Sequence, residues 1–271
     1  MLGITDESRL GRSTWLLRLR CTPDAAEQMA GALARRPDTA YVSVISGGTE
    51  VMCAMKPRTR QARDELLLNR LQRTPRVTSV SAHCLLHHFY GGPLGWLSKI
   101  NALSPEEQTT LSPPAIEPAT APVVLDDADE ALLAVLSRDG RAPLTELQAS
   151  TNLPEPAFRR RLDRLRSTGV LYLDVQFNHE RLGHDVVAML WLTVAPSALA
   201  DGGHTLATHP EVRFAAAITG QANIVAATLH PSTGDLYAYL SDKIGALDGV
   251  RTIETTLTLR EVKQLTYEPA R

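Results

Sequence analysis

The feature that most limits the fold of this chain is an internal repeat with an offset of 173 residues. The segment LARRPDTAYVSVISG (33–47) aligns without gaps with LATHPEVRFAAAITG (206–220). Five positions are identical in this alignment, namely Leu33/Leu206, Ala34/Ala207, Pro37/Pro210, Ile45/Ile218 and Gly47/Gly220. Chance does not give this many identities at a single spacing, so the chain contains two copies of one structural unit.

Each copy carries the pattern of a βαββαβ unit. It opens with a strand, which is TWLLRLRC (14–21) in the first copy, where apolar residues alternate with Arg18 and Arg20, and VVAMLWLTV (186–194) in the second. A helix, two strands joined by a turn, a second helix and a last strand follow, with the helices predicted at 24–36 and 59–73 or at 197–208 and 232–246. This order places two helices on one face of an antiparallel four-stranded sheet. The other face needs a cover, so we expect the two copies to pair with each other within one chain.

A proline-rich linker and three predicted helices lie between the copies. SPPAIEPATAPVV (112–124) holds prolines that block regular structure, and a short helix before it is predicted to begin at Ser104. The three helices come from DDADEALLAVLSRDG, PLTELQAS and PEPAFRRRLDRLRSTG, with a tight turn before the third. We therefore predict an α+β chain in which two ferredoxin-like βαββαβ domains flank a helix-turn-helix domain. The predicted boundaries are 1–111, the linker at 112–124, the helix-turn-helix at 125–176 and the last domain at 177–271.

The third helix concentrates positive charge in a chain whose net charge is only −2. On a helical wheel, Phe158, Leu162 and Leu165 form one apolar stripe, and Arg160 and Arg164 lie on the opposite face. A solvated basic face would explain the arginines alone, but this helix also follows a short helix and a tight turn, as a recognition helix does. Guanidinium groups bind phosphates and read guanine, so the pattern predicts DNA binding. The predicted contacts are Glu155, Arg159, Arg160, Arg161 and Arg164.

The composition is that of an ordinary globular protein, with 44% hydrophobic and 21% charged residues. No apolar run approaches the roughly 20 residues that span a bilayer, and the first residues do not form a signal peptide. Three widely spaced cysteines are typical of a reducing compartment, so we expect a cytoplasmic protein without membrane contact. The sequence shows no nucleotide-binding loop, nucleophile elbow or paired-carboxylate motif, and we expect neither catalytic residues nor a cofactor.

The segments LLAVLSRDGR and FRRRLDRLRSTGVL resemble the helix-turn-helix of the Lrp/AsnC family of bacterial and archaeal transcription regulators. VRTIETTLTLREVKQL resembles the last strand of that family's effector domain, often called RAM. The resemblance covers residues 126–175 and 184–266, and residues 12–90 resemble a second RAM domain. It implies βαββαβ domains that dimerise, often assemble further and commonly bind amino acids at subunit interfaces. The implied partners are double-stranded DNA, a small effector such as an amino acid, and further copies of the chain.

Two features depart from the family pattern. The glycine-plus-acid turn, which helps to hold an amino-acid effector in the family, reads TGQAN here, so that Gly220 matches but Asn223 stands where an aspartate is common. The first copy reads SGGTE, with Gly47 and Glu50, and offers the better partner for an ammonium group. Family chains also usually begin with the helix-turn-helix. We therefore expect that the first copy has lost its own, or that the reading frame begins upstream of Met1.

Two other functions stay open at the level of sequence. Siroheme decarboxylases of haem and haem d1 biosynthesis share this architecture, and AHCLLHHFYGG offers His83, His87 and His88 for holding and protonating a tetrapyrrole carboxylate. A solvated sheet edge explains the same histidines without chemistry. A metal site from His83, Cys84 and His87 would need a further ligand cluster that the sequence does not show, and we expect no metal. The other alternative is an effector-binding module without DNA binding. Salt-sensitive binding to a duplex would favour the regulator.

Overall fold

The computed structural model describes residues 1–92, 99, 104, 106–107, 121–176 and 178–265. The chain forms two compact units, one from Met1–Arg12 with Leu97–Gln176 and one from Ser13–Trp96 with Phe177–Arg271. Of the predicted helix after Ser104, the described residues are 104 and 106–107, where Ser104 and Glu107 bond each other as at a helix start, and most of the linker at 112–124 lies outside the described residues. Within the described part, no helix has both the length and the apolar character that crossing a bilayer requires.

The larger unit contains the repeat, and its two halves have the same element order. The first half consists of β2 (Trp15–Cys21), α1 (Ala26–Ala34), β3 (Thr39–Ile45), β4 (Glu50–Met55), α2 (Arg60–Asp64) and β5 (Val77–Tyr90). The second consists of β7 (Val186–Val194), α7 (Leu199–Thr208), β8 (Val212–Ile218), β9 (Ile224–His230), α8 (Thr233–Ala238) and β10 (Val250–Lys263). The bounds of β3 and β8, and those of β5 and β10, are 173 residues apart. The predicted repeat and its βαββαβ order are confirmed.

Both helix pairs share an unusual detail. The second helix of each half continues into a π-helical segment, Glu65–Arg70 after α2 and Tyr239–Ile244 after α8. Each of these helices is capped by a hydroxyl side chain, Thr59 in the first half and Ser232 in the second. The cap satisfies a backbone N–H that has no partner within the helix. The repeat therefore extends to the capping and winding of the helices.

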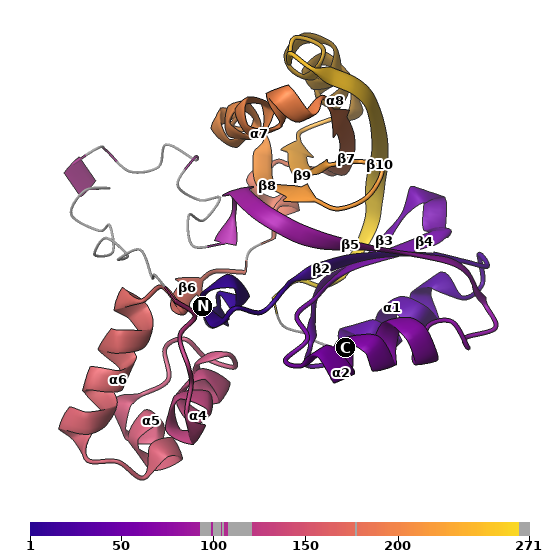
Figure 1. The fold of residues 1–271 in the computed structure, drawn as a ribbon. Helices are drawn as coiled ribbons and strands as arrows, with labels where there is room; N and C mark the ends of the chain where they lie inside the picture. The colour runs from indigo at the N-terminus through magenta and orange to yellow at the C-terminus, as the bar shows by residue number, and fades with distance from the viewer. Residues whose placement is uncertain (93–98, 100–103, 105, 108–120, 177, 266–271) are drawn as a thin grey trace. The chain divides into compact units, whose positions relative to one another are not determined.

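The two halves share a single closed barrel with the strand order β10-β3-β4-β2-β5-β8-β9-β7. Strands β5 and β10 are long enough to belong to both halves, since each pairs with its own sheet first and with an edge strand of the other half afterwards (Figure 1). The junction of β5 with β8 pairs Leu85 with Ile218, and that of β10 with β3 pairs Thr258 with Ile45. The expected pairing of the halves within one chain is confirmed. The expectation of two separate domains is corrected, because these edge pairings join both sheets into one barrel.

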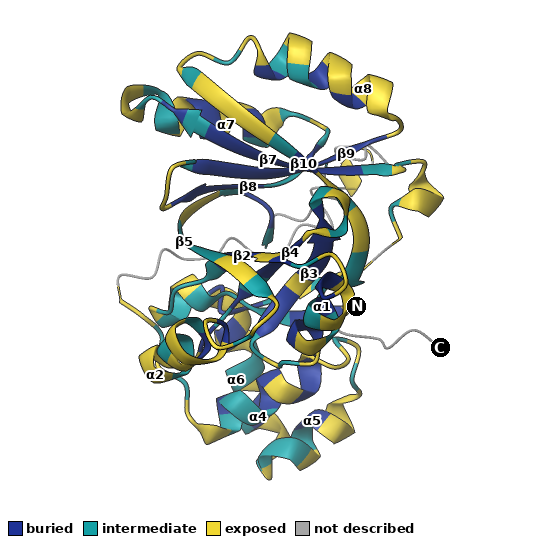
Figure 2. Ribbon diagram, turned by 90° about the vertical axis from the view of Figure 1, so that its right-hand side faces the viewer, coloured by how far each residue is buried: buried dark blue, intermediate teal, exposed yellow. Residues whose placement is uncertain are grey.

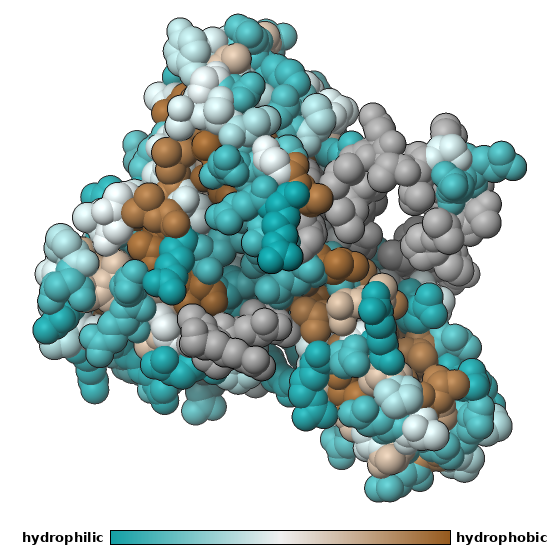
Figure 3. Space-filling model, turned by 180° about the vertical axis from the view of Figure 1, so that it is seen from behind, coloured by the Kyte–Doolittle hydropathy of each residue, from teal (hydrophilic) through white to brown (hydrophobic). Residues whose placement is uncertain are grey.

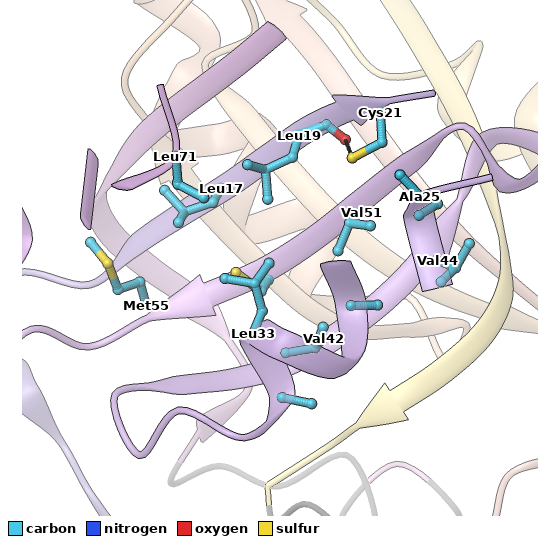
Figure 4. Packing of buried hydrophobic residues seen from close by; sticks show 14 of the residues in the cluster. Leu17, Leu19, Cys21, Ala25, Leu33, Val42, Val44, Val51, Met55 and Leu71 are labelled. Atoms are coloured by element: carbon cyan, nitrogen blue, oxygen red, sulfur yellow. Dashed lines mark hydrogen bonds between the residues drawn. The ribbon is translucent and has the colours of Figure 1, made fainter. Parts of the chain in front are cut away.

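Alternation along the strands creates two kinds of core. Figure 2 shows one four-stranded layer covered by α1 and α2 and the other by α7 and α8, with the open faces of the two layers turned toward each other. In the first half, Leu17 and Leu19 point to the helices and join the cluster drawn in Figure 4. Leu16, on the opposite face of β2, packs inside the barrel with Met52, Trp191 and Ile218. Residues from both halves therefore form the inner core.

The smaller unit is a three-helix domain of the predicted kind. It consists of α4 (Asp127–Leu136), α5 (Leu144–Thr151) and α6 (Glu155–Ser167), with Phe158 and Leu165 fully buried at 0% exposure. Asp126 and Asp129 form a capping box at the start of α4. The turn from α5 to α6 passes through Asn152 in the left-handed conformation, with φ of 53°. The predicted tight turn at TNL is thus closed by the residue type that best tolerates this conformation after glycine.

The first twelve residues belong to this helical unit. Strand β1 (Leu2–Thr5) pairs antiparallel with β6 (Leu171–Asp174), and Gly140 N–H donates to the carbonyl of Met1 at 3.0 Å. The sequence placed these residues in the domain at 1–111. They lie here because buried Leu2 and partly buried Leu10 add apolar surface to a small domain.

Candidate functional site

Helix α6 presents its arginines because its apolar residues fix its orientation. Phe158 and Leu165 are fully buried, so the opposite side of the helix is exposed. Pro156 lies in the first turn, where a missing N–H costs nothing, and Gly169 follows the helix with φ of 72°. The predicted limits of the recognition helix are confirmed.

Two of the predicted contact residues are held by an aspartate of α4. Arg161 donates to Asp126 at 2.6 Å and to Asp129 at 3.0 Å, and Arg164 also donates to Asp129. The Asp129 side chain is 1% exposed, whereas that of Arg164 is 42% exposed. The helical wheel placed Arg164 on the outer face correctly, but its guanidinium group turns toward α4. The pair Asp126 and Asp129 was the available signal, since acids three residues apart in a first turn share one side of a helix.

The charges in this cluster stabilise each other. A hydrogen bond from the Asp129 backbone N–H, followed by the bond from Arg161, lowers the pKa of Asp126. Bonds to Asp126 and Asp129 raise the pKa of Arg161. The ion pairs between α4 and α6 therefore persist at neutral pH.

The remaining arginines of the helix face solvent. Arg159 pairs with Glu155 one turn earlier at 2.7 Å, and both side chains are about half exposed. Arg160 is exposed, and no ion pair to it is found in the described part of the chain. It borders an open cavity of about 490 Å³ whose lining also includes Leu153, Ala157 and Arg164. Arg160 thus offers a guanidinium group to an external partner near the middle of the helix, and Arg166 is exposed as well at its last turn.

In the turn of the second half, the predicted effector residues Gly220 and Asn223 contact other residues of the same chain. The Asn223 side chain accepts from the Val194 N–H and donates to the Val194 carbonyl, both at 2.8 Å. Gly220 has φ of 123°, and a Cβ atom there would lie 2.5 Å from His83 Nδ1. His83 Nδ1 in turn donates to the Thr219 carbonyl at 2.7 Å. This turn needs a glycine for both its backbone conformation and its contact with β5.

The turn of the first half contains an ion cluster around a buried glutamate. Gly47 adopts φ of 69°, and Glu50 is 3% exposed. Glu50 accepts from Arg18 and Arg20, both at 2.7 Å, and from the Ser46 hydroxyl at 2.9 Å. Burial alone would raise the pKa of Glu50, but these bonds outweigh it and hold the pKa below its ordinary value.

Arg18 extends this cluster into the second half. It donates to Glu254 at 2.6 and 3.0 Å, and its Cζ lies 5.3 Å from the centre of the Trp191 ring. No sequence pattern linked Arg18 with Glu254 or Trp191. Alternation on the strands indicated a shared face, but nothing in the sequence gives the pairing across the barrel.

The histidines of β5 are spread over different surroundings. His83 packs near Trp191, with ring centres 5.4 Å apart, whereas His87 lies beside Phe89 and is exposed. Residues 1–92, 121–176 and 178–265 contain no group of three or more histidine, cysteine, aspartate or glutamate side chains that could hold a metal ion.

Models of two protein domains match the chain. The AsnC-type helix-turn-helix domain matches residues 125–166, and the Lrp/AsnC ligand binding domain matches residues 187–267. The HTH-type transcriptional regulator FL11 of Pyrococcus furiosus is 28% identical over 149 residues, which cover 55% of this chain and 98% of the relative. An uncharacterised HTH-type transcriptional regulator of Pyrococcus abyssi is 30% identical over 146 residues, 54% of this chain and 92% of the relative.

A solved structure resembles almost the whole chain. It is the siroheme decarboxylase NirDL in complex with an iron-uroporphyrin III analogue, with a TM-score of 0.66 over 98% of this chain and 77% of that chain. The identity is 14%, so this likeness shows a common fold and leaves the chemistry undecided. The two sequence relatives, in contrast, are named transcriptional regulators, in agreement with the expectation of a regulator rather than an enzyme. Since a 30% identical relative is matched over 92% of its length and both domain models agree, the chain belongs to the Lrp/AsnC family of helix-turn-helix transcriptional regulators.

Proposed function

We propose that this regulator reads DNA with the exposed face of α6, and that Arg160 is its central contact. The observation that carries the proposal is the exposed guanidinium group of Arg160 on the side opposite the buried Phe158. Arg159 and Arg164 flank it on the same helix, and Glu155 holds Arg159 in place. Arg161 contributes by joining α6 to α4 rather than by reading a base. Bidentate contact with guanine and contact with phosphate are the two chemistries that arginine brings to this position.

Equilibrium binding to an operator duplex, located first by footprinting next to the protein's own gene, tests this proposal. Arg160→Ala should weaken binding by about 1–3 kcal/mol if the side chain reads a base, or lower the salt slope by about one if it contacts phosphate. Arg251→Ala, an exposed arginine on β10, serves as the control and should leave affinity unchanged. Unchanged binding in the Arg159/Arg160/Arg164 triple alanine variant would exclude this face as the interface.

We further propose that both halves of the barrel are RAM-type domains and that one of them senses a small molecule. The match of the second half to a ligand-binding domain and the equal element order of the first support this. An amino acid is the expected effector class, with Gly47 and Glu50 or Gly220 and Asn223 at the site. Asn223 is bonded to Val194 and Glu50 to Arg18, Arg20 and Ser46, so an effector at either turn would replace a bond within the chain. A thermal-shift series with single amino acids checks the proposal. A response that is lost in Glu50→Gln but kept in Asn223→Asp would assign the site to the first half.

Self-assembly and a cytoplasmic location complete the proposal. Exposed large apolar side chains on β10 are Ile253, Leu257 and Leu259, at 38%, 38% and 60% exposure. Brown, apolar atoms form a band on the larger unit in the view of Figure 3. Apolar surface of this kind supports association between copies of the chain. The three cysteines are free, which agrees with a reducing compartment that also contains DNA.

A further inference from the structure

The barrel has two junctions between its halves, and the repeat makes them equivalent positions. At the first junction, His88 of β5 faces Ala216 of β8. At the second, Glu261 of β10 faces Ser43 of β3, each 173 residues away from its counterpart. Two identical domains would carry the same side chains at both junctions. Any difference between the junctions therefore shows how far the two halves have diverged as partners.

A steric difference between the junctions lies where each long strand passes over a helix of the other half. Phe89 of β5 lies over Gly203 of α7 so closely that a Cβ atom on Gly203 would be 2.2 Å from Phe89 Cζ. The equivalent residues at the other junction are Val262 of β10 and Ala30 of α1, which belong to one packed cluster. A large ring over a glycine at one junction thus corresponds to a smaller side chain over an alanine at the other.

The polar contacts near the centre of the barrel are also unlike. Arg18 and Trp191 occupy the same position in the repeat, and they stack on each other at 5.3 Å. Arg18 also binds Glu254 of the second half, while the residue equivalent to Glu254 in the first half is the uncharged Ser81. The ion pair between Arg18 and Glu254 therefore has no counterpart at the equivalent positions, Trp191 and Ser81. A pair of second halves would contain two Glu254 side chains and no Arg18.

We propose that the two halves have diverged into a matched pair of unlike surfaces, so that each half accepts only the other kind and rejects a second copy of itself. In a pair of first halves, Phe89 would meet the methyl group of Ala30 where the structure leaves space only for a glycine. In a pair of second halves, Val262 over Gly203 would leave a void, and Glu254 would lose its cation. The partner that fits each surface is the unlike half, which the same chain supplies at high effective concentration. Separate chains then meet through other surfaces than the barrel junctions.

Thermal unfolding of full-length variants tests the steric match. Gly203→Ala should lower the melting temperature by about 2–10 °C, because the added methyl group overlaps the Phe89 ring. Adding Phe89→Val recreates the Val262 and Ala30 combination, so the double variant should melt higher than Gly203→Ala alone. Gly234→Ala is the matched control, since its nearest atom outside the helix backbone, Ser232 Oγ, is 3.5 Å away, and it should not melt lower than the parent. An unchanged melting temperature in Gly203→Ala, or no recovery in the double variant, would overturn the proposed match.

Disulfide trapping tests whether the match excludes like pairs. In a pair of first halves, Ser43 of one copy would face His88 of the other, whereas both face the second half in the native barrel. A full-length Ser43→Cys/His88→Cys chain, with Cys84→Ser to remove the partly exposed native thiol, therefore reports like pairing as a covalent dimer. We expect almost no covalent dimer with the native junctions, and a several-fold increase when Phe89→Val/Gly203→Ala is added.

A second cysteine pair controls for access to the junction. His88→Cys/Ala216→Cys should form a disulfide within one chain in both backgrounds, since these residues are register partners. Equal amounts of covalent Ser43/His88 dimer in the two backgrounds, whether high or absent, would show that the Phe89 and Gly203 match does not select the partner, and would overturn the proposal.

Discussion

At the scale of single residues, Asp129 is the residue on which the position of the recognition helix α6 depends. It is buried, it belongs to the capping box of α4, and it accepts from two arginines of α6. Asp129→Ala should destabilise the helical unit by about 1–3 kcal/mol, because its partners lose their acceptor but remain partly solvated. Urea unfolding followed by circular dichroism measures this. Asp127→Ala, an exposed acid in the same turn, should change stability by no more than a few tenths of a kcal/mol.

Buried His230 and half-buried His179 make the larger unit sensitive to acid. Burial lowers the pKa of His179 and of His230 from the ordinary value of 6.5. Between that value and the lower folded one, the unfolded chain binds protons that the folded chain does not. Stability is therefore fully present above pH 6.5 and falls as the pH drops below it. Melting temperatures between pH 7.5 and 5 should show the decline. It should be smaller in His230→Gln, while His204→Gln, at an exposed histidine, should behave as the parent.

At the scale of elements, the turn between α5 and α6 sets the angle between the recognition helix α6 and the short helix α5. Asn152 closes this turn in the left-handed conformation, which costs a residue with an ordinary Cβ about 1–2 kcal/mol. Asn152→Ala should lower stability by about 1 kcal/mol, and Asn152→Gly should be close to neutral. Chemical unfolding of the three proteins gives the order. An alanine variant as stable as the parent would mean that the turn relaxes into another conformation.

The elements were also the part of the molecule that the sequence predicted best. The three helices of the small unit have short-range signals, since the proline and glycine positions and the stripe of Phe158, Leu162 and Leu165 define α6 without any distant contact. The repeat gave the βαββαβ order of elements along the chain, because each copy confirms the other, but it did not give the closed barrel that joins the two sheets. Residues 1–12 were misplaced because β1 is held by pairing with β6, a contact between segments about 170 residues apart in sequence.

Side-chain partners were the part that the sequence could not give. The wheel placed Arg164 on the outer face, but a wheel carries no information on where a long flexible side chain turns. Asn223 and Glu50 were read as ligand contacts from the family pattern, and the structure bonds both to neighbouring groups of the chain. Such bonds depend on distances across strands that periodicity does not encode.

At the scale of the whole molecule, one barrel accompanies one described helix-turn-helix. A single recognition helix reads a short half-site, and regulators of this kind reach specific affinity with two, spaced by about one or more turns of DNA. We therefore expect at least two chains on a palindromic operator. Sedimentation of the protein with a duplex of defined length measures the ratio. One chain bound tightly and specifically per duplex would contradict the expectation.

The long strands β5 and β10 restrict how this protein can vary. Each has 14 residues and pairs with strands of both halves, so the alternation of its side chains must fit both sheets. Removal of a single residue from the middle of either strand would turn the following side chains from the inside of the barrel to the outside. At the junction with the other half, the strand would then present its outward-facing side chains to the inside of the barrel, although its pairing within its own half was unchanged. Among homologous tandem chains, insertions and deletions should therefore gather in the loops, and the lengths of these two strands should be shared even where their residues are not.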